Sequence, residues 1–389
     1  MTEKTRTPSI RFKGFTEAWE QRKFADMATR NSEMAVCSRK LPSVEYEDIV
    51  SGQGILNKDI SEKPSIKIGI RFEPDDVLFG KLRPYLKNWI LPDFSGVAVG
   101  DFWVLHPSEI DSRYLYYLIQ TPAFQTVANQ STGTKMPRSD WNLVSKTEFF
   151  SPKDIAEQRK IGMTLQLIDN LITLHQRKCE KLHNIKKSML QKMFPENGSL
   201  FPEVRFAGFT EAWEQRKLGE CFSERVESMP EGELISVTIN EGIKRFSELG
   251  RHDNSNEDKS KYKRVCVGDI AYNSMRMWQG ASGYSPYEGI VSPAYTVLSP
   301  FSDIDSKCIA YLFKRPDIIH TFQINSQGIT SDNWNLKFQA LSEIAIPVAT
   351  NIDEQHAIAA FFASLDNFIT LHQRKGVVCI PSEYRVVPS

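Results

Sequence analysis

The hydrophobic residues of the chain follow two different patterns. Residues 24–150 and 218–347 contain short runs of β-branched and aromatic residues, which Gly and Pro interrupt. Such runs predict short strands joined by loops, for example in VLFGKLRPYLKNWILP and GITSDNWNLKFQALSEIAIPV. Two further segments in these regions predict short helices that end near proline, namely YLYYLIQTPAF and CIAYLFKRPDII. Both regions therefore predict a mixed α/β fold.

A helical pattern runs from Lys153 to Phe194, a segment with no Pro and with Gly162 as its only glycine. Its apolar residues recur four and three positions apart or at multiples of seven, at Ile161, Leu165, Ile168, Ile172, Cys179, Leu182, Met189 and Met193. This heptad stripe predicts a helix about 60 Å long that pairs with another helix. The alternative is a helix lying across one domain, but such lengths are rare in globular cores. We therefore predict an inter-domain coiled coil.

The chain also repeats itself. RFKGFTEAWEQRK, which begins at Arg11, returns at Arg205 as RFAGFTEAWEQRK, and only Lys13 is changed, to Ala207. Residues 156–178 return as residues 353–375, and the two copies share ITLHQRK without a change. Weaker matches between these anchors keep the same order, so the two halves are colinear. Repetition at so long a period indicates domain duplication rather than a solenoid.

These patterns together predict the domain limits. We expect a first domain, a spacer helix, a second domain, a shorter second helix and an atypical tail, at residues 1–152, 153–195, 196–349, 350–375 and 376–389. The tail reads GVVCIPSEYRVVPS after the second ITLHQRK, where the first copy continues CEKLHNIKKSMLQKMF. Gly376 and Pro381 predict that the second helix stops there.

Composition excludes several classes of protein. The 389 residues are 41% hydrophobic and 25% charged, as in an ordinary globular protein, and no apolar run is long enough to span a membrane. The six cysteines form no C-x-x-C pair, which argues against a zinc site or disulfide framework and favours the cytoplasm. The 48 basic and 48 acidic residues balance, so any nucleic-acid surface must be a local patch.

Catalytic motifs are missing from the sequence. No phosphate-binding loop, dinucleotide turn or methyl-donor turn is present, so we expect no catalytic residue, metal or cofactor. Asp76 and its repeat Asp269 are predicted to cap turns rather than to form a nuclease site. His175 and its repeat His372 are predicted to lie on a helix face.

Basic, polar and aromatic residues gather instead at corresponding positions of the two halves. Lys and Arg neutralise phosphates, while Arg, Asn and Gln have the donor geometry to read base edges. In the first half the candidates for DNA contact are Lys81, Arg83, Tyr85, Lys87, Thr134, Lys135 and Arg138. In the second half they are Lys261, Lys263, Arg264, Asn273, Arg276, Gln279, Ser331 and Asn333. The surrounding frame repeats while the loops diverge, which suggests two similar recognition units with two different targets.

The repeated motifs resemble those of the specificity subunit (HsdS) of type I restriction–modification systems. The resemblance rests on FTEAWEQRK, on EQ followed by LITLHQRKCEKLHNIKKSMLQKMFP, on PDDVLFGKLRPYLKN and on GTKMPRSDWNL. It covers nearly the whole chain, from about Ile10 to Lys375.

The resemblance implies a fold, a function and partners. The expected fold is two duplicated α/β target-recognition domains separated by long antiparallel coiled-coil helices. Each domain would read one half of a bipartite target in double-stranded DNA, and the helices would set the spacer. The chain itself would be non-catalytic and would bind two modification (methyltransferase) subunits and the restriction subunits. We expect the helix-pairing and partner-facing residues to be Ile161, Leu165, Ile168, Ile172, Leu182, Met189, Phe361, Leu365 and Phe368.

Two other classes of function fit the sequence less well. A self-contained nuclease–methyltransferase would need the missing cofactor and metal motifs. A coiled-coil scaffold without DNA specificity of its own would explain the helices but not the divergent basic loops.

Overall fold

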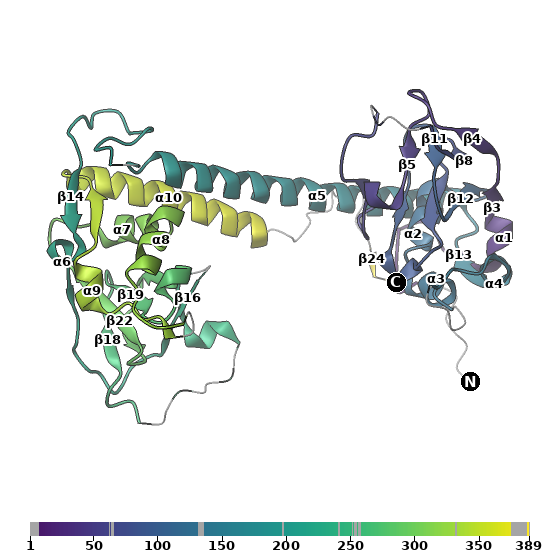
Figure 1. Cartoon of the computed structure of the whole chain (residues 1–389). Helices are drawn as coiled ribbons and strands as arrows, with labels where there is room; N and C mark the ends of the chain where they lie inside the picture. The colour runs from purple at the N-terminus through teal and green to yellow at the C-terminus, as the bar shows by residue number, and fades with distance from the viewer. Residues whose placement is uncertain are drawn as a thin grey trace. The chain divides into compact units, whose positions relative to one another are not determined.

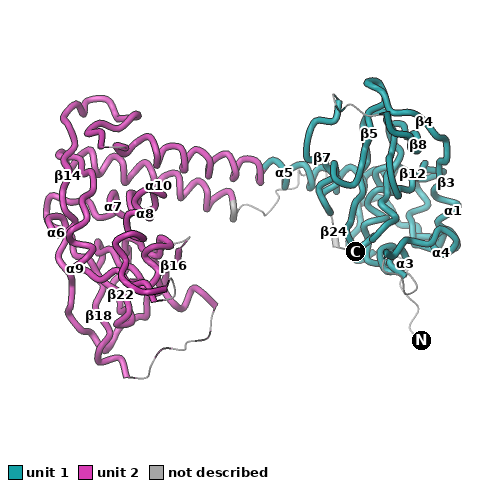
Figure 2. Tube along the Cα trace, viewed as in Figure 1, with its two compact units in different colours: residues 1–174, 377–389 teal, residues 175–376 magenta. Residues whose placement is uncertain are grey.

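The structure, a computed structural model, describes residues 8–374 except 62, 64–65, 131–135, 197, 240–241, 251, 253–254, 256–257 and 331–332, and also residues 387–388. The chain forms two compact units (Figure 2). Unit 1 consists of residues 1–174 and 377–389, and unit 2 of residues 175–376. The division falls inside the long helix α5 (Ile155–Lys192). The domain limits given above remain a prediction.

Unit 1 is built from short strands followed by helices. Its strands are β1 (Ile10–Arg11), β2 (Glu20–Lys23), β3 (Ala28–Asn31), β4 (Met34–Val36), β5 (Ser43–Val44), β6 (Ile49–Val50), β7 (Ile55–Leu56), β8 (Ile68–Phe72), β9 (Val77–Gly80), β10 (Trp89–Ile90), β11 (Gly96–Ala98), β12 (Phe102–Pro107), β13 (Glu148–Ser151) and β24 (Val387–Pro388). Its helices before α5 are α1 (Phe24–Met27), α2 (Ser112–Leu118), α3 (Pro122–Ala128) and α4 (Trp141–Lys146), with 3-10 turns η1 (Tyr46–Asp48) and η2 (Pro84–Leu86).

Unit 2 repeats much of this order. Its strands are β14 (Glu214–Lys217), β15 (Phe222–Glu224), β16 (Ile235–Thr238), β17 (Gly242–Arg245), β18 (Lys263–Val265), β19 (Ile270–Asn273), β20 (Ser282–Tyr284), β21 (Gly289–Val291), β22 (Tyr295–Pro300) and β23 (Ala345–Val348). Its helices are α6 (Leu218–Cys221), α7 (Ser306–Leu312), α8 (Pro316–Ile324), α9 (Phe338–Ser342) and α10 (Ile352–Arg374), with 3-10 turns η3 (Phe246–Leu249) and η4 (Met277–Gln279).

The same four-stranded sheet lies at the centre of each unit. Its strand order is β10-β9-β12-β3 in unit 1 and β20-β19-β22-β15 in unit 2, and all neighbours are antiparallel. Side chains alternate across a strand, so Val77 and Phe79 pack into a core with the helices while Leu78 packs into a second core on the other face. Burial on both faces explains why β9 and β19 read as continuous apolar runs.

The repeated sequence motifs hold each unit together. The guanidinium of Arg11 donates two hydrogen bonds of 2.7 Å to the buried carboxylate of Glu157, and Arg205 binds Glu354 in the same way at 2.7 and 2.8 Å. The next residue of each motif, Gln158 or Gln355, accepts a hydrogen bond from the N-cap residue of α2 or α7. The identical residues at the two sites therefore make the same long-range contacts in each unit.

Asp76 and Asp269 also act alike, as predicted. Asp76 accepts a 2.8 Å hydrogen bond from the backbone of Glu73, and Asp269 accepts one of 2.8 Å from Cys266, so each caps the turn before a central strand.

The two long helices pair antiparallel within unit 2, as Figure 1 shows for α10 and the end of α5. The rings of His175 and His372 lie 6.0 Å apart, and Lys186 forms a 2.5 Å ion pair with Asp366. These contacts and the mixed α/β units confirm the predicted fold class. None of the helices in the described ranges is both long and apolar enough to cross a membrane.

One local prediction needs correction. The segment that begins at Gly328 was predicted to form strands and loops, but it contains the helix α9. Its residues Leu341 and Ile344 join the core of unit 2, so tertiary burial outweighs the local strand pattern. The segments YLYYLIQTPAF and CIAYLFKRPDII form short helices that end before proline, as predicted. Each proline also begins a further helix, α3 or α8, because proline fits the first turn of a helix.

Candidate nucleic-acid interface

In unit 1, two loops far apart in the sequence meet at the end of the central sheet. The backbone N–H of Arg83 donates to Pro137 at 2.7 Å, and that of Ser139 donates to Lys81 at 2.8 Å. These bonds tie the loop after β9 to the loop before α4. The structure therefore brings together Lys81, Arg83 and Arg138, which were predicted separately.

A carboxylate partly neutralises this basic cluster. Arg138 donates to Asp101 from Nε at 3.2 Å and from Nη2 at 2.9 Å, and Lys81 Nζ lies 3.6 Å from the other carboxylate oxygen. The hydrogen bonds and charge of Asp101 raise the pKa of the Arg138 guanidinium. Half of the Arg138 side chain is nevertheless exposed, at 53%. Asp101 can thus hold the two cations in place while DNA is absent.

The tip of the first loop has an unusual backbone. Arg83 and Lys87 adopt φ values of 48° and 56°, a left-handed conformation that few residues other than glycine take up. They flank the 3-10 turn η2, which presents Tyr85 at 55% exposure. Arg83 Nε is buried and has no hydrogen-bond partner in the described part of the chain. Strained residues of this kind gather at functional sites, where the surrounding structure fixes them.

Two loops also meet in unit 2. The backbone N–H of Leu336 donates to Ser274 at 2.9 Å, and the rings of Trp278 and Trp334 touch edge to face at 5.3 Å. Three of the predicted side chains lie on these loops as exposed groups: Arg276, Gln279 and Asn333. Asn273 lies at the end of β19, where its side chain accepts a hydrogen bond from the backbone of Met275.

Three other predicted residues of unit 2 lie on a different part of the unit. Lys263 and Arg264 belong to β18, which pairs with β21 rather than with the central sheet. Lys263 forms a 3.3 Å ion pair with Glu224. Arg264 binds Glu227 and Glu288 at 3.0 and 2.5 Å, and these bonds raise its pKa. Lys261, just before the strand, is exposed. Thr134, Lys135 and Ser331 lie outside the described residues.

Lys314, a partly buried cation beneath the second loop pair, was not among the predicted residues. Its ammonium donates to the backbone carbonyls of Gly280, Ser282 and Ile239 at 2.7, 2.8 and 3.1 Å. Burial, followed by the nearby charge of Lys186, lowers its pKa to about 8. Lys314 therefore fixes the end of the loop that carries Arg276. One sequence signal could have found it, because the corresponding residue of the first half is uncharged, Gln120.

The predicted helix-pairing residues fall into three groups. Leu182, Met189, Phe361 and Leu365 pack in one core of unit 2. Phe368 and Ile172 form a second group, with 54% and 44% of their surface exposed. Ile161, Leu165 and Ile168 form the third group and lie in unit 1, where Ile161 packs against the core.

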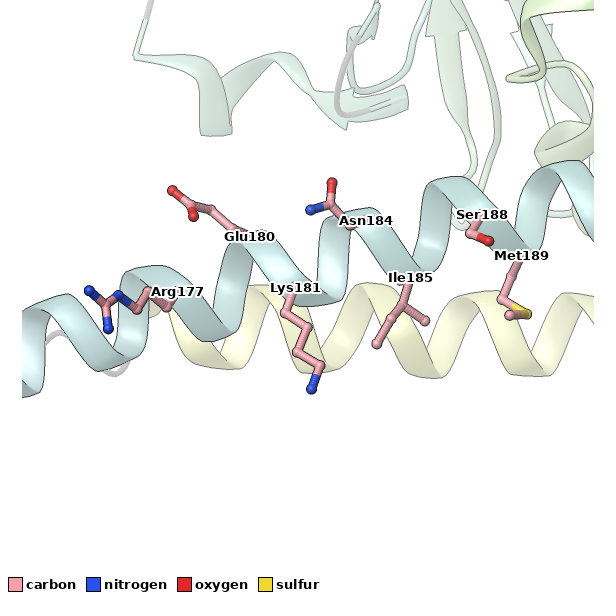
Figure 3. Close-up of a pocket in the computed structure, with 7 residues that line it drawn as sticks. All are labelled: Arg177, Glu180, Lys181, Asn184, Ile185, Ser188 and Met189. Atoms are coloured by element: carbon pink, nitrogen blue, oxygen red, sulfur yellow. The ribbon is translucent and has the colours of Figure 1, made fainter. Parts of the chain in front are cut away.

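Part of α5 is left open by this pairing. Figure 3 shows seven residues that line a shallow hollow on the helix: Arg177, Glu180, Lys181, Asn184, Ile185, Ser188 and Met189. Glu180, Asn184 and Ser188 point to one side of α5, while Ile185 and Met189 point to the side along which α10 runs (Figure 3). The helix pair thus keeps a polar row available to other molecules.

Comparison with known proteins gives a consistent result. Residues 210–377 match the model of the type I restriction modification DNA specificity domain. The structure of the type I restriction–modification S subunit from M. genitalium is similar, with a TM-score of 0.58, 15% identity and 95% coverage of both chains. No curated protein matches this chain.

Two further solved structures align with lower TM-scores. The HsdS subunit from Thermoanaerobacter tengcongensis gives 0.42 at 16% identity, covering 94% of this chain and 92% of that chain. A chain from a study of complex assembly and conformational transition of the type I R-M system gives 0.46 at 16% identity, covering 92% and 93%.

The matched segment spans the second half of the chain, and the first half repeats its motifs, its central sheet and its Arg–Glu contact. This duplication shows that the two units share one fold. Residues 210–377 therefore match the type I restriction modification DNA specificity domain, and the chain as a whole is similar in fold to the M. genitalium S subunit.

Proposed function

We propose that each unit reads one half of a bipartite DNA target and that the helix pair sets the spacer between the halves. The observation that carries this proposal is the pair of loop clusters, built on the same sheet but bearing different side chains. Lys81, Arg83 and Arg138 form one cluster, whereas Arg276 and Gln279 belong to the other. The two units share the same sheet but differ in their loop residues, as expected if they recognise two different half-sites.

We further propose that the chain is non-catalytic and acts with two modification subunits and the restriction subunits. The polar row of α5 supports a docking role for the helices, because the pairing with α10 leaves Glu180 and Asn184 exposed. No group of three His, Cys, Asp or Glu side chains able to hold a metal occurs among the residues with described positions. The scaffold alternative is not favoured, because residues 210–377 match a DNA specificity domain.

Sequencing of methylated DNA tests whether each unit recognises one half-site. The chain would be produced with its modification subunit in cells that lack other DNA methylation, first unchanged and then as Arg83→Ala or Arg276→Ala. A bidentate Arg–guanine contact is worth about 1–3 kcal/mol of discrimination, or roughly 5- to 150-fold. Each variant should relax base preference within one half-site only.

Arg39→Ala is the matched control. Arg39 is exposed in the turn after β4, away from the two loops of the first cluster in sequence, and it should leave the methylated motif unchanged. If Arg83→Ala relaxed both half-sites equally, the assignment of one half-site to each unit would be wrong.

A further inference from the structure

The end of helix α5 packs into an aromatic groove of unit 2, which we call the seat. Phe206 and Trp213 form one wall of this seat, and α10 supplies the other through Ile358, Phe361, Phe362 and Leu365. Met189, Met193 and Phe194 fill it. The ring of Phe194 lies 5.9 Å from that of Trp213 and 6.2 Å from that of Phe362, and its side chain is only 1% exposed.

The duplication builds the same seat a second time, in unit 1. Phe12 and Trp19 occupy the positions of Phe206 and Trp213, and α5 supplies Ile161, Thr164, Leu165 and Ile168 where α10 has its four seat residues. The buried Arg–Glu pair beside the seat is also repeated, as Arg11 and Glu157. We call this second seat the unit 1 groove.

Among the described residues, none fills the unit 1 groove in the way that Phe194 fills the seat of unit 2. All six of these residues line a pocket of about 370 Å³, together with Pro8, Ile10, Arg11 and Glu157. Trp19 and Leu165 are half-buried, whereas their counterparts Trp213 and Phe362 are 2% and 0% exposed. A largely apolar hollow thus lies where unit 2 buries the side chains of a helix end.

The filled seat also indicates which occupant fits the groove. In unit 2 the occupant is the pattern Met-x-x-x-Met-Phe at the end of a helix. This pattern occurs once in the sequence, at Met189 to Phe194, where Met193 and Phe194 are already buried. A second copy of the chain would have to open its own core to donate it. The tail GVVCIPSEYRVVPS does not contain it.

We propose that the unit 1 groove binds a helix end of the Met-x-x-x-Met-Phe type carried by another polypeptide. The groove would bury its apolar side chains against Trp19 and Leu165, as unit 2 buries Phe194. Such a helix, added in trans, would complete unit 1 in the way that α5 completes unit 2.

A peptide-binding assay tests this proposal. The probe is a fluorescent peptide with the sequence of residues 179–196, titrated into the full chain and followed by fluorescence anisotropy. We expect saturable binding, and at least tenfold weaker binding by a peptide carrying M189S, M193S and F194S. This peptide comparison needs no change in the chain itself.

Variants of the chain locate the binding site. Leu165→Lys should weaken binding at least tenfold, whereas Met163→Lys should not, because Met163 is 41% exposed on the same helix and does not line the groove. Replacing the residues after Lys375 with CEKLHNIKKSMLQKMF should fill the groove in cis, abolish peptide binding and raise the melting temperature.

Several results would overturn the proposal. One is equal binding by the native and triple-serine peptides, and another is equal loss in the two lysine variants. Undiminished binding by the chain with the restored tail would place the peptide elsewhere. Analytical ultracentrifugation gives the remaining test, since self-association that Leu165→Lys abolishes would make a second copy the occupant.

Discussion

Replacing Asp101 with Asn tests whether this carboxylate restrains the basic cluster of unit 1. In the native chain it lies within 2.9 Å of Arg138 and 3.6 Å of Lys81. The substitution keeps the shape of the side chain and leaves the backbone carbonyl of Asp101, which accepts from Tyr46 and from the N–H of Lys81. Only the negative charge is removed. Two cations then lose their partner and become available to phosphates.

The size of the effect follows from the geometry. Two unit charges about 4 Å apart in water interact by about 1 kcal/mol, and these side chains are 28–53% exposed. Releasing both pairs should therefore tighten non-specific DNA binding by about 1–2 kcal/mol, which is roughly 5- to 30-fold. Each additional neutralised phosphate steepens the log–log dependence of affinity on salt by about 0.9, so two steepen it by about 1.8.

The assay is fluorescence anisotropy of the full chain with a random-sequence duplex over a range of salt concentrations. Asp93→Asn is the matched control, because it makes the same change in net charge at an exposed residue of unit 1 that forms no ion pair with a described residue. If Asp101→Asn and Asp93→Asn gave the same affinity and the same salt slope, Asp101 would not restrain the cluster.

Three further predictions concern stability. Phe362→Ala should lower the free energy of unfolding by about 3–5 kcal/mol because the ring is fully buried, whereas Leu165→Ala, at the matching half-buried position, should cost only about 1 kcal/mol, both measured by urea denaturation. Arg205→Met should lower the free energy of unfolding, measured by calorimetry, by about 3–5 kcal/mol, because it leaves the carboxylate of Glu354, which is 1% exposed, without its cation. A smaller loss of stability in Arg205→Met than in the double variant with Glu354→Gln would contradict this reasoning. Burial lowers the pKa of Lys314 from 10.5 to about 8, so the unfolded chain binds more protons than the native chain between these pH values. The free energy of unfolding should therefore rise by roughly 3 kcal/mol between pH 8 and 10.5, relative to that of Lys314→Met. If the stability of the two proteins changed in parallel with pH, the assignment of this pKa to Lys314 would be wrong.

The duplication, the mixed α/β class and the long helix could all be predicted from the sequence. These features are written in local patterns: a repeated motif, interrupted apolar runs and a heptad stripe. The antiparallel pairing about His175 and His372 was also within reach, because identical segments related by duplication can meet each other at equivalent residues. The loops whose residues differ between the two halves indicated where the recognition surfaces of the two units differ.

Which distant residues meet depends on the tertiary fold. Arg11 and Glu157 are separated by 146 positions, and no local period links them. The structure likewise showed that Asp101 neutralises part of the first cluster, that Arg264 is bound by two carboxylates and that Lys314 is partly buried. Charge neutralisation and burial depend on neighbours in space rather than in sequence. For this reason the sequence predicted the basic residues of the candidate site, but the fold determines which of them are exposed and not neutralised by a neighbouring carboxylate.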